Sequence, residues 1–216
     1  YKHLYIEYSN KQSLLKSLIS TIPDHIFYKD RDYRYISCNN AFADFYGKKE
    51  ENIISKNDYD IFGSAVADRI RAIDIAVLND EKEVRTEMDV SDHEGNMYIF
   101  ESILTPYYDA NKHCIGLIGV GRDITERKKR EEEVIYLSQH DILTGLYNRL
   151  YLEKAYNQLD NLENLPISVI IGDINGLKMV NDSLGHKYGD QSIKDIAEIL
   201  KKCCAEKGII ARTGGD

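Results

Sequence analysis

Residues 84–105 read VRTEMDVSDHEGNMYIFESILT, and this stretch decides the fold class of the first half of the chain. Residues at every second position alternate with polar neighbours: Val84, Thr86, Met88 and Val90. A period of two is that of a half-buried β-strand. Glu94-Gly95-Asn96 has the composition of a turn, and Met97–Thr105 is again rich in β-forming residues. The stretch therefore predicts two strands of an antiparallel sheet.

The residues on either side complete an α+β unit. Two short β-rich runs, His25–Lys29 and Tyr33–Cys38, are separated by a polar turn and predict a hairpin. A further strand is predicted at His113–Arg122. Apolar residues at helical spacing predict helices at Ser13–Ile22 and Ser64–Asp80. This order of elements indicates a five-stranded antiparallel sheet with flanking helices.

Thr125–Ser138 is predicted to be an exposed linker helix. Opposite charges recur at i,i+4 spacing, which stabilises such a helix: Glu126–Arg130, Arg127–Glu131, Lys128–Glu132 and Lys129–Glu133. Val134 and Leu137 form a thin apolar seam, so a short coiled coil between two protomers is the alternative. We favour a linker with weak dimer character.

Beyond the linker, helices alternate with strands. Helical patterns occupy Leu150–Asn161 and Gln191–Cys204, whereas β patterns occupy Ile167–Gly172 and Ile209–Arg212. Alternation of this kind predicts an α/β domain, which is incomplete in this chain.

Composition limits the classes of function. The chain has 216 residues, enough for one large domain or two small ones, and 28 basic against 36 acidic residues give a net charge of −8. Such an acidic chain argues against sequence-independent nucleic-acid binding. The 4 cysteines form no disulfide framework, which suits a reducing cytoplasm. No apolar run is long enough to span a membrane. Because the sequence starts at Tyr1 and stops inside a motif, we treat it as a fragment and leave upstream membrane segments open.

Two carboxylates follow predicted strands of the α/β part. Asp173 comes directly after Ile167–Gly172, and Asp216 follows Ile209–Arg212 and a glycine pair. If the two strands are neighbours, both carboxylates meet at one sheet edge, where their oxygens suit Mg²⁺. The plainer interpretation is that both are ordinary turn residues.

Asn181 and Asp190 lie between these carboxylates and could bracket a nucleobase. An ionised carboxylate accepts two hydrogen bonds, which matches the adjacent N–H donors of guanine and not adenine. Alternatively, 181–190 is a polar, glycine-rich loop in which Asp190 is the N-cap of the helix that starts at Gln191. The residues alone leave both interpretations open.

Four motifs in order strongly resemble the GGDEF domain of diguanylate cyclases, over roughly the first half of such a domain. They are DILTGLYNR at 141–149, DINGLK at 173–178, ND, GH and GD at 181–190, and RTGGD at 212–216. The earlier region resembles a PAS domain through YISCNNAF at 35–42 and GRDITER at 121–127. The resulting domains are an N-terminal helical segment (1–22), a PAS sensor (23–124), a helical linker (125–138) and the N-terminal part of a truncated GGDEF domain of nucleotide-cyclase type (139–216).

The resemblance implies a signalling protein in which the PAS domain regulates condensation of two GTP molecules to cyclic di-GMP and pyrophosphate. It implies Mg²⁺ or Mn²⁺ as cofactor, with Asp173, Asp216 and the backbone carbonyl of Ile174 as ligands. Asp216 also takes the position of the proposed general base. Asn181 and Asp190 fall at the guanine-reading positions, and three residues fall where the phosphates approach: Gly176, Leu177 and Lys178. The family also implies a homodimer, formed through the PAS domain and linker.

The sequence departs from the family pattern in ways that bear on activity. The Glu-Phe that should follow Asp216 is absent, so we expect the chain as given to be inactive. Asn175 and Gly176 replace a commoner Asp and a bulky aromatic residue. The alternative function is therefore a degenerate GGDEF module that binds GTP, or a PAS dimerisation module, without catalysis. Ala205–Gly208 lacks the Arg-x-x-Asp of the family's inhibitory site, which argues against product inhibition there.

The ligand of the PAS domain is not identified by the sequence. No His occurs between His25 and His93, which disfavours haem, and Cys38 lacks the sequence context of flavin photochemistry. Cys38 is interpreted as a small core residue. Several tyrosines could line a pocket, although Tyr rings on a sheet usually pack: Tyr28, Tyr33, Tyr35, Tyr46 and Tyr59. We expect an empty pocket or one that takes a small metabolite.

Overall fold

The computed structural model describes residues 2–204 and 208–215. The chain divides into two compact units, Tyr1–Arg127 and Lys128–Asp216, and each is described by itself. No helix within the described residues is long and apolar enough to cross a membrane.

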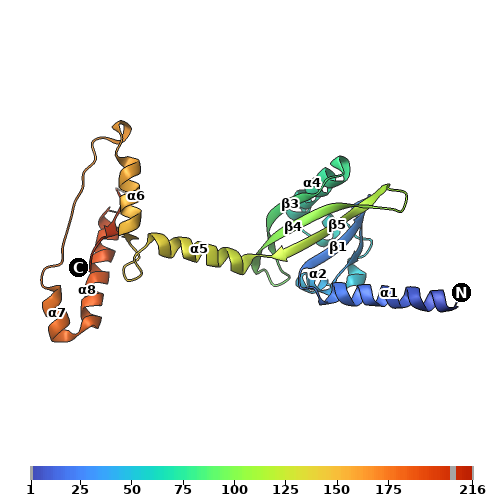
Figure 1. Ribbon diagram of the computed structural model, residues 1–216, viewed down its shortest axis with the longest axis horizontal. Coiled ribbons are helices and arrows are strands. Elements are labelled where there is room, and N and C mark those ends of the chain that lie inside the picture. Colours follow the sequence, from blue (N-terminus) through green and yellow to red (C-terminus); the bar gives the residue numbers. More distant parts are fainter. Residues whose placement is uncertain (1, 205–207, 216) are drawn as a thin grey trace. The chain divides into compact units, whose positions relative to one another are not determined.

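The first unit is built on a five-stranded antiparallel sheet with strand order β2-β1-β5-β4-β3 (Figure 1). Its strands are β1 (His25–Asp30), β2 (Tyr35–Cys38), β3 (Val84–Ser91), β4 (Met97–Tyr108) and β5 (Cys114–Asp123). The predicted hairpin forms as the β1–β2 pair, and the opening stretch forms β3 and β4, with Val84 opposite Leu104 and Ser91 opposite Met97. The predicted α+β fold with an antiparallel sheet is confirmed.

Glycine in β5 lets the neighbouring strand pack closely. A Cβ atom at Gly119 would lie 2.2 Å from Cζ of Phe27, and one at Gly116 would lie 2.1 Å from the carbonyl oxygen of Lys29. Both distances are far shorter than a carbon atom allows, so Gly116 lets the backbone of β1 lie against β5, and Gly119 leaves room for the ring of Phe27.

The first unit also contains helices (Figure 1). They are α1 (Lys2–Thr21), α2 (Asn40–Phe45), the 3₁₀ turn η1 (Glu50–Asn52), α3 (Asp58–Ile61) and α4 (Ser64–Asp80). Asn39 caps α2 by accepting a hydrogen bond from the backbone N–H of Phe42, and Asn57 forms a reciprocal capping box with Asp60 at α3. The sequence predicted α4 with its observed bounds, whereas α1 begins before the predicted Ser13.

Two apolar clusters make up the core of the first unit. One cluster contains Tyr35, Cys38, Phe42, Ala43 and Ile53. The other contains Val77, Leu78, Leu104, Cys114 and Leu117. Cys38 is a buried core residue, as the sequence indicates.

The second unit is mainly helical. Its elements are α5 (Thr125–Gln139, which starts in the first unit), β6 (Tyr147–Asn148), α6 (Arg149–Leu159), η2 (Leu162–Asn164), α7 (Leu177–Leu184), α8 (His186–Cys204) and β7 (Ala211–Arg212). Strands β6 and β7 pair in parallel, with Tyr147 opposite Ala211. Helix α5 confirms the prediction that the charged linker is continuously helical.

The structure corrects three predictions for this unit. The strand expected at Ile167–Gly172 does not form: within the described residues the segment has no β partner, and Ile170 is 93% exposed. A strand is stable only when a neighbour accepts and donates its backbone hydrogen bonds. The strand expected at Ile209–Arg212 shortens to the two residues of β7 that face β6. The last helix begins at His186, not at Gln191.

Candidate functional site

The residues expected to meet phosphates lie at the start of α7. Gly176 has φ +81°, a left-handed conformation that favours glycine, and is the N-cap of the helix. Its carbonyl accepts a hydrogen bond from the N–H of Val180 at 3.1 Å. Leu177 is buried, whereas Lys178 is exposed. The turn thus places free backbone N–H groups and one ammonium group at the same helix end, where anions are favoured.

The residues expected to read guanine are brought together by the turn between α7 and α8. Asn181 lies in the last turn of α7, and a Cβ atom at Gly189 would be 2.0 Å from its Oδ1. Glycine at 189 therefore lets α8 approach the amide of Asn181, next to Asp190. Oδ1 of Asn181 is buried and has no hydrogen-bond partner among the described residues, whereas Asp190 is exposed.

The alternative interpretation of this segment is wrong. Residues 181–190 are the end of α7, a turn at Gly185 and the start of α8, not an extended loop. Because α8 begins at His186, Asp190 is inside the helix and is not its N-cap.

The expected metal ligands are not brought together among the described residues. Asp173 and Ile174 lie in an irregular segment, where Asp173 is exposed. Asp216 lies outside the described residues, as does most of the predicted Ala205–Gly208 segment. In the described part of the chain, no group of three His, Cys, Asp or Glu side chains could hold a metal ion. The carboxylate of Asp173 has the chemistry that Mg²⁺ prefers, but a single donor is not a metal site.

The DILT motif fixes the turn before β6. Asp141 Oδ1 accepts hydrogen bonds from the backbone N–H of Thr144 at 2.9 Å and from its hydroxyl at 2.7 Å. Arg212 of the RTGGD motif reaches both carboxylate oxygens at 3.2 Å. Burial would raise the pKa of Asp141, but the hydrogen bonds from Thr144 and the pairing with Arg212 lower it. Two of the four motifs are thus held together by an ion pair.

Four aromatic rings stack in succession beside this turn. The ring of Tyr136 in α5 lies 4.2 Å from that of His140, which lies 4.6 Å from that of Tyr147. Tyr147 in turn stacks on Tyr151 of α6 at 3.8 Å. A hydrogen bond with Tyr151 raises the pKa of the Tyr147 hydroxyl. The stack joins the end of α5 to β6 and α6.

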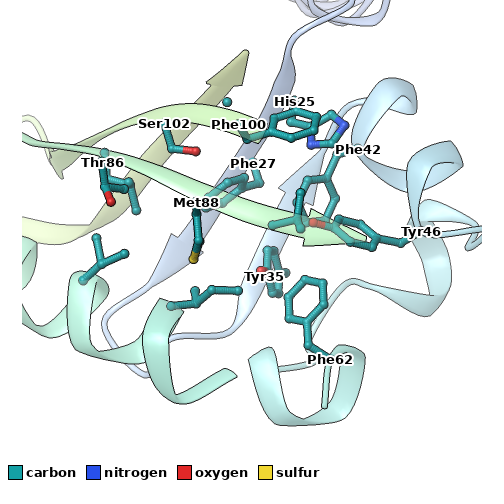
Figure 2. Close-up of a pocket in the computed structure, with 15 residues that line it drawn as sticks. His25, Phe27, Tyr35, Phe42, Tyr46, Phe62, Thr86, Met88, Phe100 and Ser102 are labelled. Carbon is teal, nitrogen blue, oxygen red and sulfur yellow. The ribbon is translucent and has the colours of Figure 1, made fainter. Parts of the chain in front are cut away.

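The first unit contains a cavity of about 50 Å³ between the sheet and its helices (Figure 2). It is lined by His25, Phe27, Tyr35, Phe42, Tyr46, Phe62, Ile70, Ile73, Thr86, Met88, Val90, Phe100, Ser102, Leu104 and Gly121. Of the tyrosines expected around a pocket, Tyr35 and Tyr46 line this cavity, and Tyr28, Tyr33 and Tyr59 do not.

His25 is the most unusual group on the cavity wall. Its side chain is buried and stacks on Phe100 with 4.2 Å between ring centroids. Phe45 and Phe42 meet it edge-on at 4.8 and 5.6 Å (Figure 2 labels Phe42 and Phe100). Burial lowers its pKa from 6.5 to about 4, although nearby Asp123 and Asp24 act in the opposite direction. The imidazole is therefore neutral at physiological pH.

A fully buried ionic cluster lies next to the hydroxyl group of Tyr35. The Lys29 ammonium is 2.6 Å from a carboxylate oxygen of Asp58 and 2.6 Å from one of Asp74, and all three side chains are fully buried. The Tyr35 hydroxyl donates to Asp58 at 2.9 Å. Arg71 lies 3.6 Å from Asp58. Burial raises the pKa of Asp74 to about 6, despite the opposing effect of Lys29.

Our sequence reasoning missed this cluster, although a signal for it existed. The period of two in β1 places His25, Phe27 and Lys29 on one face of the strand. The buried Tyr35 and Phe42 lie against Phe27, so this face points into the core. A lysine on an inward face requires a buried acid. The sequence does not show which acids supply it, because Asp58 and Asp74 are far away along the chain.

Comparison with known proteins gives the family. A family model of the PAS fold matches residues 19–129, about half of the chain. The chain belongs to the PAS family. A model of the diguanylate cyclase GGDEF domain matches residues 138–216. The first unit is hereafter the PAS unit and the second the GGDEF unit.

Relatives that match most of this chain carry different activities in their names. A diguanylate cyclase of Vibrio cholerae serotype O1 is 27% identical over 216 residues, which cover 97% of this chain and 67% of that protein. The cyclic di-GMP phosphodiesterase PdeR of Escherichia coli is 27% identical over 181 residues, which cover 82% of this chain and 27% of PdeR. The chain thus spans only part of the length of these relatives.

Among solved structures, an RNA-binding light-oxygen-voltage receptor has a TM-score of 0.50 and 18% identity, covering 59% of this chain and 37% of that one. This likeness concerns the fold alone.

Proposed function

We propose that the PAS unit regulates a diguanylate cyclase, in which the GGDEF unit binds GTP and condenses two GTP molecules, one on each protomer, to cyclic di-GMP and pyrophosphate. The observation that supports this most is the buried Oδ1 of Asn181, which has no hydrogen-bond partner in the described part of the chain and lies beside Gly189-Asp190. Guanine presents two adjacent N–H donors, and an amide oxygen next to a carboxylate supplies two acceptors for them. Adenine lacks this donor pair.

The other proposed site residues follow from their places in the unit. The N–H groups after Gly176 and the ammonium of Lys178 bind the phosphates at the start of α7. Asp173, the carbonyl of Ile174 and Asp216 would hold Mg²⁺ or Mn²⁺, and the ion would neutralise phosphate charge. Asp216 also accepts the proton of the attacking 3′-hydroxyl. We propose that the protein acts in the cytoplasm as a homodimer.

The test compares nucleotides and two aspartates of the same helix. The protein in its full natural length should bind GTP more tightly than ATP, and Asp190→Ala should abolish most of that preference, about tenfold. Asp195 is the matched control, because it is also exposed on α8 and accepts a hydrogen bond from Gln191 at 2.7 Å. Equal affinity for GTP and ATP in the unmutated protein would contradict the proposal.

A second candidate is a GGDEF module that binds GTP and regulates another domain without catalysis. Two observations favour it: Gly176 stands where the family has a bulky aromatic residue, and one relative is named a phosphodiesterase. Incubation of the full-length protein with GTP and Mg²⁺, followed by chromatography, separates the candidates. Formation of cyclic di-GMP supports the cyclase, whereas GTP binding without product supports the regulatory module.

A further inference from the structure

Two carboxylates of the PAS unit share one ammonium group. Nζ of Lys29 lies 2.6 Å from Oδ1 of Asp58 and 2.6 Å from Oδ2 of Asp74, so these two oxygens are at most twice that distance apart. All three side chains are fully buried, and with both acids ionised they carry one negative charge in excess. Two carboxylates held in one buried site disfavour each other's ionisation, and one of them then keeps a proton more readily.

A nearby guanidinium group compensates this excess charge only weakly. Nη2 of Arg71 lies 3.6 Å from Oδ2 of Asp58, which is too far for a hydrogen bond. The Arg71 side chain is 21% exposed, so water screens its charge. Its guanidinium carbon lies 4.1 Å from the centre of the Tyr33 ring. The fully buried part of the cluster therefore stays negative unless it binds a proton.

Each carboxylate also has one oxygen that lacks a donor. Oδ2 of Asp58 and Oδ1 of Asp74 are buried and accept no hydrogen bond from the described residues. Buried carboxylate oxygens are normally satisfied, because an unpaired one is costly. A proton on Oδ1 of Asp74 would turn this oxygen into a donor, and Oδ2 of Asp58 is an acceptor in the same cluster. One proton would thus satisfy both oxygens.

The contacts of the two acids select Asp74 as the one that takes the proton. Asp58 accepts a second hydrogen bond, from the hydroxyl of Tyr35 at 2.9 Å, and lies beside Arg71; both neighbours stabilise its charged form. Among the described residues, Asp74 accepts a side-chain hydrogen bond from Lys29 alone. In agreement with this difference, burial raises the pKa of Asp74 to about 6, although Lys29 acts in the opposite direction.

The strands under α4 add no further charge at Asp74 in the described part of the chain. Strands β3, β4 and β5 contribute four side chains to the core there: Val84, Leu104, Cys114 and Leu117. The thiol of Cys114 is the titratable group among them, and it donates to the carbonyl of Gly116 at 3.5 Å. The charged groups that act on Asp74 come from β1, α3 and α4 itself: Lys29, Asp58 and Arg71.

We propose that Asp58 and Asp74 form a proton-binding site, in which Asp74 takes up one proton from water on acidification and donates it in a hydrogen bond to Asp58. Lys29 continues to donate to Oδ2 of Asp74. The proton binds more tightly to the closed site than to an Asp74 exposed to water, so its uptake holds α4 more firmly against the sheet. The PAS unit thereby responds to acidification. This inference goes beyond the proposed function, because the site does not involve the GGDEF unit.

The direct test follows the carboxyl carbon of Asp74 by NMR in the whole chain, labelled with ¹³C at Cγ of its aspartates. Asp74→Asn identifies the signal by removing it; if this variant does not fold, the signal is assigned through the backbone resonances of Asp74. We expect the signal to move from the position of a carboxylate to that of a carboxylic acid, with a midpoint near pH 6. A signal that stays at the carboxylate position down to pH 5 overturns the proposal.

Hydrogen exchange of the α4 amides tests the structural response. The ratio of protection in the unmutated chain to that in Asp74→Asn should rise about tenfold from pH 7 to pH 5, because the pKa of Asp74 is about 6 in the closed site and 3.8 when exposed. Protonation of His25 affects both proteins alike and cancels in the ratio. A ratio that is equal at the two pH values overturns the tightening of α4.

Asp80→Asn is the matched control, because it removes an exposed carboxylate from the same helix. The ratio for this variant should not change between pH 7 and pH 5, and a tenfold rise here as well would overturn the assignment to Asp74. Neither measurement uses a nucleotide. Failure of both therefore leaves the proposed function standing, and failure to make cyclic di-GMP leaves the proton site standing.

Discussion

The two units treat their apolar β-rich segments in opposite ways. In the PAS unit, each strand has a neighbour: Leu117 in β5 pairs with Lys29 of β1 and Pro106 of β4, and its side chain is fully buried. In the GGDEF unit, residues 167–171 have an equally apolar composition, yet Ile170 and Ile171 are 93% and 91% exposed and pair with no strand in the described part. β-Structure depends on partners, whereas helices such as α7 and α8 satisfy their backbone locally.

A second difference is where buried charge is placed. The PAS unit buries an ammonium and two carboxylates completely, whereas the ion pair of the GGDEF unit, Asp141–Arg212, keeps about a fifth of each side chain exposed. Loss of one partner from a completely buried cluster leaves a charge that water cannot reach. The predictions below test how far stability in each unit depends on such groups.

The largest effect is expected from Lys29→Met, which removes the only ammonium group that lies within 2.6 Å of both Asp58 and Asp74 in the described structure. The PAS unit should lose about 3–5 kcal/mol of unfolding free energy. Urea unfolding is monitored by hydrogen exchange of the amides of β1 and β5. This measurement reports the stability of the PAS unit alone. Addition of Asp74→Asn should restore part of the loss.

The control is Lys16→Met. Lys16 is 79% exposed and lies 3.9 Å from Glu50, so its replacement should have no measurable effect. A loss below about 1 kcal/mol for Lys29→Met would show that the cluster is not a structural requirement of the PAS unit.

A smaller effect concerns pH. The pKa of His25 is about 4 in the folded PAS unit, against an ordinary value of 6.5 for the unfolded chain, so protonation of the unfolded chain lowers stability as the pH falls from 6.5 towards 4. The pKa of Asp74 is raised from 3.8 to about 6, so the folded state binds its proton first, and stability from this group is lost as the pH rises from about 4 to about 6. The two contributions, each about 3 kcal/mol in full, oppose one another.

Single variants should therefore separate the two opposing pH dependences of stability. Relative to the unmutated chain, Asp74→Asn should lose stability more steeply on acidification from pH 6.5 to 4, and His25→Phe should lose it less steeply. Urea midpoints across this range measure both. Parallel profiles for the three proteins would contradict the opposed titrations.

The ring stack of the GGDEF unit gives an effect of about 1–2 kcal/mol. Tyr147→Leu retains an apolar side chain but removes the contacts with the rings of His140 and Tyr151. Hydrogen exchange in α6 should rise accordingly. Tyr156→Leu on the same helix is the control, because Tyr156 is 50% exposed and makes no ring contact among the described residues. Equal effects of the two variants would show that the stack does not stabilise this unit.

Features that depend on neighbouring residues in the sequence could be predicted, whereas features that depend on contacts between distant residues could not. The hairpin, β3, β4 and α4 were predicted because alternation and helical spacing are local signals, as is the charge pattern of α5. The prediction of a strand at Ile167–Gly172 was wrong because a strand requires a neighbouring strand as partner, which a local sequence pattern does not reveal. The predicted start of α8 was wrong because Gly185 and Gly189 suggest a loop. In the structure, Gly189 lies in the helix and allows its close contact with Asn181.

The candidate sites show the same limit. The motifs identified Asn181 and Asp190, and the structure places Asn181 against the residue before Asp190. The roles of Asp173 and Asp216 stay predictions. His25 and the Lys29 cluster were missed because they depend on contacts between distant parts of the chain, such as Lys29 with Asp74.

The smallest expected effect gives the sharpest comparison between the two units. Ile170→Asp should change the stability of this chain by less than about 0.5 kcal/mol, because the side chain is already 93% exposed. Leu117→Ala in the PAS unit should cost about 2–5 kcal/mol, since it leaves a cavity in a fully buried position. Both values come from urea unfolding, with hydrogen exchange assigned to each unit. If Ile170→Asp is as costly as Leu117→Ala, residues 167–171 pack as a buried strand in solution. The contrast between the units would then be wrong, and the carboxylate of Asp173 would stand at the end of a strand, as the sequence predicts.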